Sequence, residues 1–266
     1  MQPNDTRTIK SVETSFEILE YLREKKEGTI SELADELGQS PGTIHTHLST
    51  LKERGFVVQP DRRYRLGPQF LPFGEHVRHH SELYRAAHEQ VDELAQQTGE
   101  TAHLIIEYGG QIYTLYENFG SDAVGVEYHS KKRQKPLNHL HCTAAGKVIL
   151  AHSSKQRRRT FFDRCDFQST GPNTITDPEA FESELQTVAD RGLAFANEEQ
   201  IQGIRAVGAP IVTQGGAVLG AITVSGPTTR LKDERFREHL PEKVLHAAEV
   251  AELNLQAERD YGGQLR

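Results

Sequence analysis

Residues 29–56, TISELADELGQSPGTIHTHLSTLKERGF, predict two short helices joined by a tight turn. Apolar residues recur on one face of each helix at spacings of three and four, which is typical of helices that pack on a core. These residues are Ile30, Leu33, Ala34 and Leu37 in the first helix, and Ile44, Leu48 and Leu51 in the second. Gly38 ends the first helix, Ser40 caps the second, and Pro41 occupies its first position. The pattern therefore predicts a helix-turn-helix with one buried face and one free face.

The free face of the second helix carries short or polar side chains that can reach phosphates or base edges in a DNA major groove. They are Ser40, Thr43, His45, Thr46, His47 and Thr50. Residues 56–66 predict a β-hairpin with a basic tip, which would be the wing of such a domain. Its arginines, which would contact phosphates, are Arg62, Arg63 and Arg65. Ordinary helical domains also contain such helix pairs, but the basic hairpin favours a winged helix-turn-helix that binds DNA.

Charge and composition restrict where a nucleic acid could bind. The 266-residue chain is 36% apolar and 26% charged, which is ordinary for a soluble protein and long enough for two domains. Its net charge of -7 would repel nucleic acid, so DNA contact is expected only from the N-terminal part. The sequence has no apolar segment typical of a signal peptide or a membrane span, which predicts a cytoplasmic protein without a membrane partner. Cys142 and Cys165 cannot form a disulfide framework, and no cofactor is expected.

The remaining pattern predicts a two-domain α+β protein. An amphipathic helix over 11–25 would complete a winged helix-turn-helix DNA-binding domain at 8–68. A linker helix is expected over 69–80, and its apolar start indicates contact with a partner chain. The second domain is expected over 81–258. Its predicted helices lie at 81–98, 156–162, 178–189 and 231–259, the last broken or restarted at Pro241, and its strands at 102–106, 111–116, 123–128, 205–212 and 217–225.

A loop and helix over 136–151, PLNHLHCTAAGKVILA, form a candidate ligand site. The small residues 143–146 would let a ligand approach free backbone amides, and the helix dipole favours an anion there. Close packing of the helix on a sheet would require the same small residues. His139, His141 and Cys142 also lie close together, but a metal site or a nucleophile pair would need a third group that the sequence does not identify.

Several motifs in order give the chain its resemblance to the IclR family of transcriptional regulators. They are TIHTHLSTLKERGFV, LNHLHCTAAGKVILA, RGLAFANEEQIQGIRAVGAPI and GGAVLGAITVSGP, and the match extends from residue 8 to about 256. The resemblance implies an effector-binding second domain with a six-stranded antiparallel sheet flanked by helices, akin to GAF and PAS sensor domains. It also implies a repressor or activator, not an enzyme, that binds a small-molecule metabolite. Homodimers or dimers of dimers would bind an inverted repeat in double-stranded promoter DNA.

The resemblance also implies the residues of the effector pocket. The backbone at Ala144 and Ala145 would meet the carboxylate or polar head of the effector, and Thr223 and Ser225 would offer hydroxyls. The family often has an acid at the position of Ala196 and a cysteine at that of Ala206, so this pocket is expected to be less polar. His139 and His141 could replace the lost polarity. In the DNA-reading helix, Pro41 and Thr46 stand where many relatives carry a lysine and an arginine, which shifts phosphate contacts toward the wing.

Two alternatives remain open at the level of sequence. The first is a GAF-like redox or metal sensor that controls DNA binding through Cys142 and His141. The second is a thiol or metal hydrolase in the second domain, although no complete set of nucleophile, base and orienting group is visible.

Overall fold

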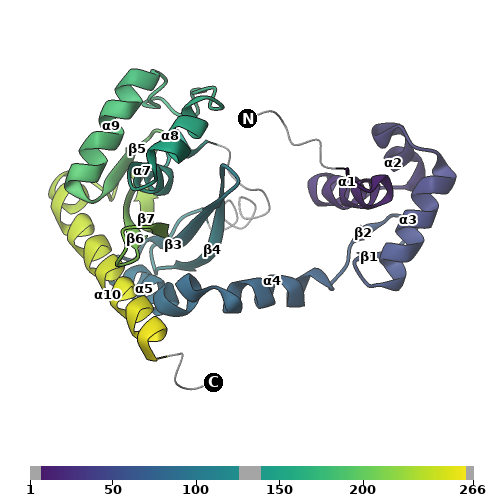
Figure 1. Ribbon diagram of the computed structural model, residues 1–266, viewed down its shortest axis with the longest axis horizontal. Helices are drawn as coiled ribbons and strands as arrows, with labels where there is room; N and C mark the ends of the chain where they lie inside the picture. The colour runs from purple at the N-terminus through teal and green to yellow at the C-terminus, as the bar shows by residue number, and fades with distance from the viewer. Residues whose placement is uncertain (1–6, 126–138, 262–266) are drawn as a thin grey trace. The chain divides into compact units, whose positions relative to one another are not determined.

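The computed structural model describes residues 7–125 and 139–261. The chain forms two compact units, one ending at Val77 and one beginning at Arg78, and each is described by itself. The N-terminal unit contains a helix pair with a small hairpin, and the C-terminal unit contains a helix-flanked sheet (Figure 1). No helix of the described residues is long and apolar enough to cross a membrane.

The N-terminal unit is a winged helix-turn-helix. Its elements are α1 (Lys10–Lys25), α2 (Ile30–Leu37), α3 (Pro41–Glu53) and the antiparallel strands β1 (Val57–Val58) and β2 (Arg65–Leu66). The predicted local signals are present: Thr29 forms a capping box with Glu32, and Gly38 adopts a left-handed φ of 61°. The apolar faces pack into one core around Ile18, Leu33, Ile44 and Leu48. α4 (Phe70–His80) begins in this unit and ends in the other.

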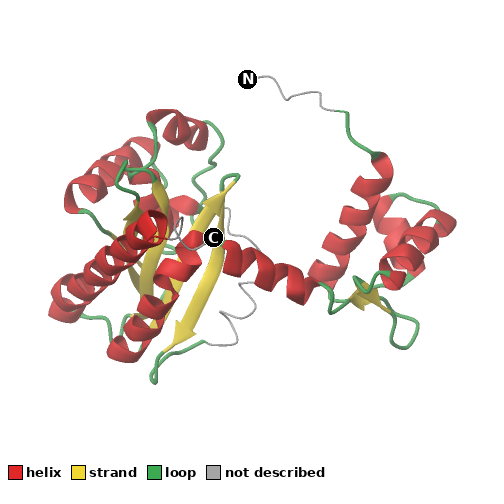
Figure 2. Cartoon of the chain, turned by 60° about the horizontal axis from the view of Figure 1, so that its bottom comes forward, coloured by secondary structure: helices red, strands yellow, loops and turns green. Residues whose placement is uncertain are grey.

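The C-terminal unit is built on a five-stranded antiparallel sheet in the order β4-β3-β7-β6-β5. The strands are β3 (Thr101–Tyr108), β4 (Gln111–Phe119), β5 (Ala194–Asn197), β6 (Ile204–Val212) and β7 (Val218–Pro227). The helices are α5 (Glu82–Thr98), α7 (Ala144–Ala151), α8 (Lys155–Phe162), α9 (Pro178–Arg191) and α10 (Leu240–Tyr261). α5 and α10 cover one face of the sheet, and α7 and α9 cover the other (Figures 1 and 2).

This two-sided packing determines which strand residues can line a site. In β7, Ile222 and Val224 belong to the core with α5 and α10, whereas Thr223 and Ser225 project toward the face that carries α7. Alternation along a strand explains this division, because successive side chains point to opposite faces of the sheet.

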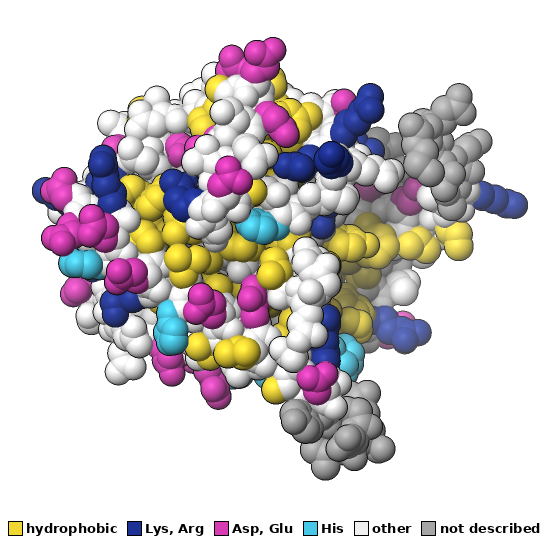
Figure 3. Space-filling model, turned by 60° about the vertical axis from the view of Figure 1, so that its left-hand side comes forward, with side chains coloured by type: hydrophobic (Ala, Val, Ile, Leu, Met, Phe, Trp, Pro, Cys, Tyr) yellow, Lys and Arg dark blue, Asp and Glu magenta, His cyan; other side chains and the backbone are white. Residues whose placement is uncertain are grey.

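On the outer surface of the C-terminal unit around α9 and α10, acidic and basic side chains are interspersed around apolar ones (Figure 3). That mixture is typical of a solvated surface, not of a phosphate-binding one.

One sequence-based expectation needs correction. The first three residues of the strand predicted over 123–128 are not in a strand, because Ala123 N donates to Gly120 O (3.1 Å) in a turn. The rest of that prediction, with the basic run at 131–135, lies outside the described residues. The C-terminal helix restarts beside Pro241, as the sequence predicted. A π-helical turn over Arg235–His239 comes first, and α10 begins at Leu240. Pro241 therefore lies in the first turn of α10, where the N–H that proline lacks would have no partner within that helix.

Candidate functional site

The exposed face of α3 carries the residues predicted to read DNA. Ser40 caps the helix by accepting from Thr43 N (3.1 Å), so part of the hydrogen-bonding capacity of both residues serves the fold. Thr46 and Thr50 donate to carbonyl oxygens one turn earlier, at 3.0 and 3.1 Å. Those bonds fix the hydroxyl protons inward and leave the oxygen lone pairs on the exposed side, where they can accept from a base. His45 is also exposed.

His47 is held differently from its neighbours on α3. Its Nδ1 lies 2.9 Å from Ser15 Oγ in α1, and the ring is half-buried. The bond orients the ring, and it leaves Nε2 as the atom that can meet a base or a phosphate. His47 thus links α3 to α1.

The three arginines of the wing differ in whether they have an acidic partner. Arg63 pairs with Glu27 (2.6 Å) and Glu32 (2.8 Å), and Arg65 places Nε 2.8 Å from Glu27 as well. The bond from the Thr29 backbone, together with Arg63, lowers the pKa of Glu32. Arg62 is exposed and makes no ion pair with any described residue. Two of the three predicted phosphate contacts are therefore partly neutralised by acids from the α1–α2 region, a charge effect that counting along the wing alone could not detect.

A cavity of about 330 Å³ lies in the C-terminal unit between the N-terminal end of α7 and the sheet. Its lining includes five of the residues predicted for an effector: Ala144, Ala145, Ala206, Thr223 and Ser225. Ala206 pairs with Ala196 across β5 and β6, and both line the cavity. The side chains that sequence reasoning missed come mostly from the first hairpin of the sheet and from the loop after β5: His103, Thr114, Glu117, Gln200 and Arg205.

The beginning of α7 serves both packing and the cavity. Gly146 packs so closely that an added Cβ would lie 2.1 Å from Leu140 O, which explains the glycine. Thr143 caps the helix by accepting from Gly146 N (3.0 Å). The amides of Ala144 and Ala145 make no hydrogen bond to another described residue, and both residues line the cavity. The helix start therefore presents two backbone donors and the positive end of the helix dipole to the cavity.

A buried ion pair stands behind this helix start. Lys147 of α7 is 1% exposed, and its Nζ lies 2.7 Å from Glu199 Oε2, 3.2 Å from Glu184 Oε1 and 3.1 Å from Phe195 O. Glu199 also lines the cavity. Burial raises the pKa of Glu199, and Lys147 opposes the rise. Lys147 thus fixes Glu199 in the wall of the cavity.

His139 and His141 are not among the residues that line the cavity. His141 is fully buried, with Nε2 3.0 Å from Gln168 O, and its ring packs against Phe167 and Phe181. Desolvation lowers the pKa of His141. The thiol of Cys142 lies against the cavity and donates to His139 O (3.3 Å). Among the described residues, no group of three His, Cys, Asp or Glu side chains could hold a metal ion.

Each of the two units matches a known protein family. Residues 11–61 match the family model for the IclR helix-turn-helix domain, and residues 75–252 match that for the bacterial transcriptional regulator IclR C-terminal domain. The chain is 40% identical over 253 residues to the probable HTH-type transcriptional regulator ArcR of Halobacterium salinarum, covering 95% of this chain and 96% of that one. It is 30% identical to the HTH-type transcriptional regulator KdgR of Escherichia coli, covering 91% and 90%. The crystal structure of the Thermotoga maritima IclR protein superposes with a TM-score of 0.74 at 26% identity, covering 93% and 99%.

Proposed function

The chain belongs to the IclR family of transcriptional regulators, and from this premise we propose which of its residues bind DNA, effector and partner chain. It is a DNA-binding regulator whose C-terminal domain binds a small-molecule effector. We assign DNA binding to residues 8–68, the link to 69–80, and effector binding to 81–258. It acts by binding, without turnover, on promoter DNA in the cytoplasm. One observation carries this assignment: α3 presents an exposed polar face beside a basic wing.

We assign base reading to α3 and phosphate contact mainly to the wing tip. Thr46, Thr50 and His47 would face base edges from the major groove, while Ser40 and Thr43 mark the helix start near a phosphate. Arg62 is the wing cation that is ready to meet a phosphate, since acids already hold Arg63 and Arg65. A phosphate would have to compete with Glu27 and Glu32 for those two arginines.

We propose that the carboxylate of the effector, its acid end, binds at the start of α7. The amides of Ala144 and Ala145 face the cavity, and the hydroxyl of Thr223 lies on the neighbouring strand. A carboxylate there would accept from donors that no described residue uses, and it would gain from the helix dipole. Ala196 and Ala206 keep the opposite wall apolar, which suits a ligand with a carbon chain.

A homodimer is proposed through apolar residues that the N-terminal unit exposes. Ile9, which precedes α1, and Val12 and Phe16 on one face of α1 are 68%, 46% and 61% exposed. Phe73 and Val77 are exposed on α4 as well, at 55% and 65%. A second copy would cover these residues, and two-fold symmetry would present two copies of α3 to an inverted repeat. Effector binding would then favour one arrangement of the two reading helices over another.

The proposal is tested by binding the purified protein to the DNA just upstream of its own gene, against random DNA, at several salt concentrations. Arg62→Ala is expected to weaken binding to both DNAs and to reduce the slope of log affinity against log salt by about 1 per protomer, which is about 2 for a dimer. Loss of one phosphate contact from each protomer releases fewer counterions, which explains the smaller slope. Arg159→Ala, an exposed arginine of the C-terminal unit, should leave both quantities unchanged.

His47→Ala provides the complementary test of base reading. It should lower affinity for the upstream DNA more than for random DNA, because base contacts depend on sequence and phosphate contacts do not. Ser15→Ala removes the bond that orients the ring, and the bond from the same hydroxyl to Ser11 O, but it keeps the imidazole, so its effect should be smaller. Equal losses on both DNAs from His47→Ala would contradict the assignment of reading to α3.

A further inference from the structure

The edge strand β4 contains a β-bulge at Leu115. Thr114 and Tyr116 pair with consecutive residues of β3, so Leu115 between them has no cross-strand partner of its own. The extra residue of a bulge lies outside the regular pairing of the ladder. Its carbonyl oxygen accepts from Arg78 Nε at 3.0 Å, and Arg78 lies in the last turn of α4. The bulge therefore holds the end of the linker helix against the sheet.

The same bulge borders the effector cavity. Ile112 and Thr114, which precede Leu115 in β4, both line the cavity, and Leu115 itself is buried in the core with α5 and α10. A ligand in the cavity contacts the strand directly before the bulge, while Arg78 contacts it at the bulge. Because neighbouring Cα atoms are only about 3.8 Å apart, a displacement of Thr114 also moves the carbonyl of Leu115.

A second contact joins the end of α4 to the same part of β4. The ring of Tyr116 packs edge-to-face on Tyr84 of α5 with centroids 5.5 Å apart, and Tyr84 meets the ring of His79 at 5.2 Å. The Tyr116 hydroxyl donates to Asp92 Oδ1 (2.8 Å). Burial and Asp92 raise the pKa of Tyr116 to about 12, so this hydroxyl keeps its proton at neutral pH. Tyr84 therefore connects His79 to the residue that follows the bulge.

We infer that Arg78 and the Leu115 bulge form a joint through which the effector cavity and α4 influence each other. The joint has two states, with the Leu115 carbonyl bound to Arg78 or released from it, and a ligand that favours one state at either site biases the other site. Arg78 is a positioning residue, since it is not among the residues that line the cavity. The inference rests on the proposed function, because it takes the cavity and the DNA-binding face as the two coupled sites.

Promoter DNA serves as the probe, because coupling between two sites is reciprocal and the effector need not be known. Hydrogen exchange of the full-length protein is measured by mass spectrometry with and without the DNA upstream of its own gene. In the parent protein, DNA should change the exchange rate of the amides over 113–117 by about 5-fold or more, the lower end of typical coupling between sites. Slower exchange means that DNA favours the bound joint, and faster exchange that it favours the released one. Peptides from α9, which packs on α7, should not change.

Arg78→Ala tests the joint directly. It removes the guanidinium that holds the Leu115 carbonyl, so the DNA-dependent change over 113–117 should be lost while DNA binding persists by fluorescence anisotropy. A merely structural role would alter exchange equally with and without DNA and would leave the difference intact. Arg78→Lys keeps a cationic donor and should retain part of the change.

Arg191→Ala is the matched control for the loss of an arginine. Arg191 also donates to a backbone carbonyl, that of Leu193 at 3.2 Å, but it does so beside β5 at the opposite edge of the sheet. This variant should keep the full DNA-dependent change over 113–117. Far-ultraviolet circular dichroism verifies that each variant is folded.

The outcomes distinguish this inference from the proposed function. If the parent protein binds the DNA but exchange over 113–117 does not change, or if Arg78→Ala leaves the change intact, the joint is wrong while DNA binding stands. If the parent protein shows no preference for the upstream DNA over random DNA, the proposed function fails and the inference falls with it.

Discussion

Lys147→Met is expected to lower the free energy of unfolding of the C-terminal unit by about 3 kcal/mol at pH 7, because it leaves a buried carboxylate without its cation. Lys147 is 1% exposed, and its Nζ lies 2.7 Å from Glu199 Oε2. Methionine has a similar unbranched side chain, so the substitution removes mainly the ammonium group with its charge and hydrogen bonds. Urea unfolding followed by circular dichroism measures the change, since the chain contains no tryptophan.

The decrease in the free energy of unfolding caused by Lys147→Met should depend on pH in a defined direction. Burial already raises the pKa of Glu199 above its ordinary value of 4.5, and Lys147 is the group that lowers it most. Without Lys147 the pKa rises further. A carboxyl group whose pKa is higher in the folded than in the unfolded state favours the folded state while it is protonated, and this contribution is lost as the group ionises. The destabilisation caused by Lys147→Met should therefore be smallest near pH 4.5 and should grow as pH rises through the folded-state pKa of Glu199.

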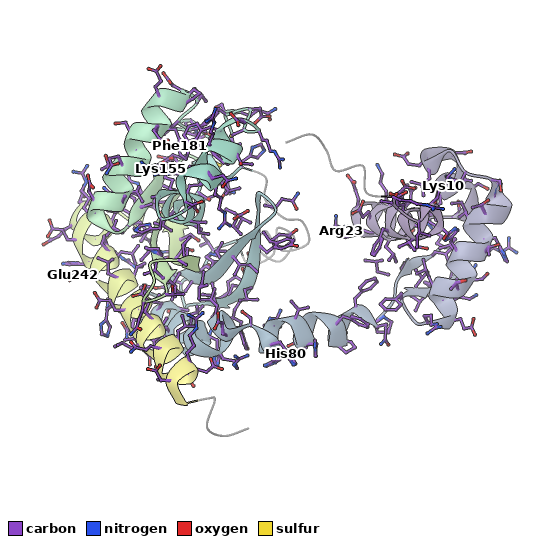
Figure 4. All side chains as sticks on the ribbon, viewed as in Figure 1. Lys10, Arg23, His80, Lys155, Phe181 and Glu242 are labelled. Carbon is purple, nitrogen blue, oxygen red and sulfur yellow. The ribbon has the colours of Figure 1, made fainter. Side chains whose placement is uncertain are left out.

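Two further variants isolate the buried charge. Lys155→Met, at the exposed start of α8 (Figure 4), should change the free energy of unfolding by less than about 0.5 kcal/mol. Lys147→Met combined with Glu199→Gln should recover much of the loss, since the carboxylate that still lacks the lysine is then Glu184, whose side chain is 25% exposed and can be hydrated. A single Lys147→Met variant as stable as the parent at pH 7 would show that the ion pair does not stabilise this wall of the pocket.

Phe16→Glu is expected to convert the proposed dimer to monomers and to weaken binding to a two-half-site promoter DNA by roughly 10²- to 10⁴-fold, the advantage that linked binding modules provide. Phe16 is 61% exposed on α1 in the single chain. In a two-fold interface each copy would bring the same new carboxylate into an apolar contact, so burial and charge repulsion both oppose association. Sedimentation velocity measures the oligomeric state, and fluorescence anisotropy measures DNA binding.

Matched substitutions make the dimer prediction specific. Val77→Glu, in the apolar face of α4, should act in the same direction as Phe16→Glu. Tyr108→Glu, which replaces another exposed aromatic residue at the end of β3, should leave both oligomeric state and affinity unchanged. A Phe16→Glu protein that remains dimeric and binds the promoter normally would show that α1 is not the interface.

The two predictions concern different links between effector and DNA. Lys147 supports the pocket from behind α7, where the acid end of the effector is proposed to bind, whereas Phe16 would keep two reading helices together. The first variant should therefore impair effector binding with little change in DNA binding at temperatures where it is folded. The second should impair DNA binding while the effector pocket persists, so the two functions can be measured separately.

The sequence alone determined the features whose signals are local. Thr29, Ser40 and Gly38 act within one helical turn, so the boundaries of α2 and α3 could be predicted from neighbouring residues. Alternation along β7 likewise predicted that Thr223 and Ser225 share a face, and the structure places both in the lining of the cavity. The order of the motifs was enough to predict the family and the two-domain α+β fold.

Only the tertiary structure decided which distant residues meet. Arg63 and Arg65 count as free charges in the sequence, but Glu27 and Glu32 approach them when α1 and α2 pack beside the wing. In β4 a register shift opposite Leu104 and Ile105 breaks the alternation, so that Thr114 and Glu117 both face the cavity although they are three residues apart. The physical reason is that strand register and charge pairing arise from contacts across the fold, and neither leaves a pattern among adjacent residues.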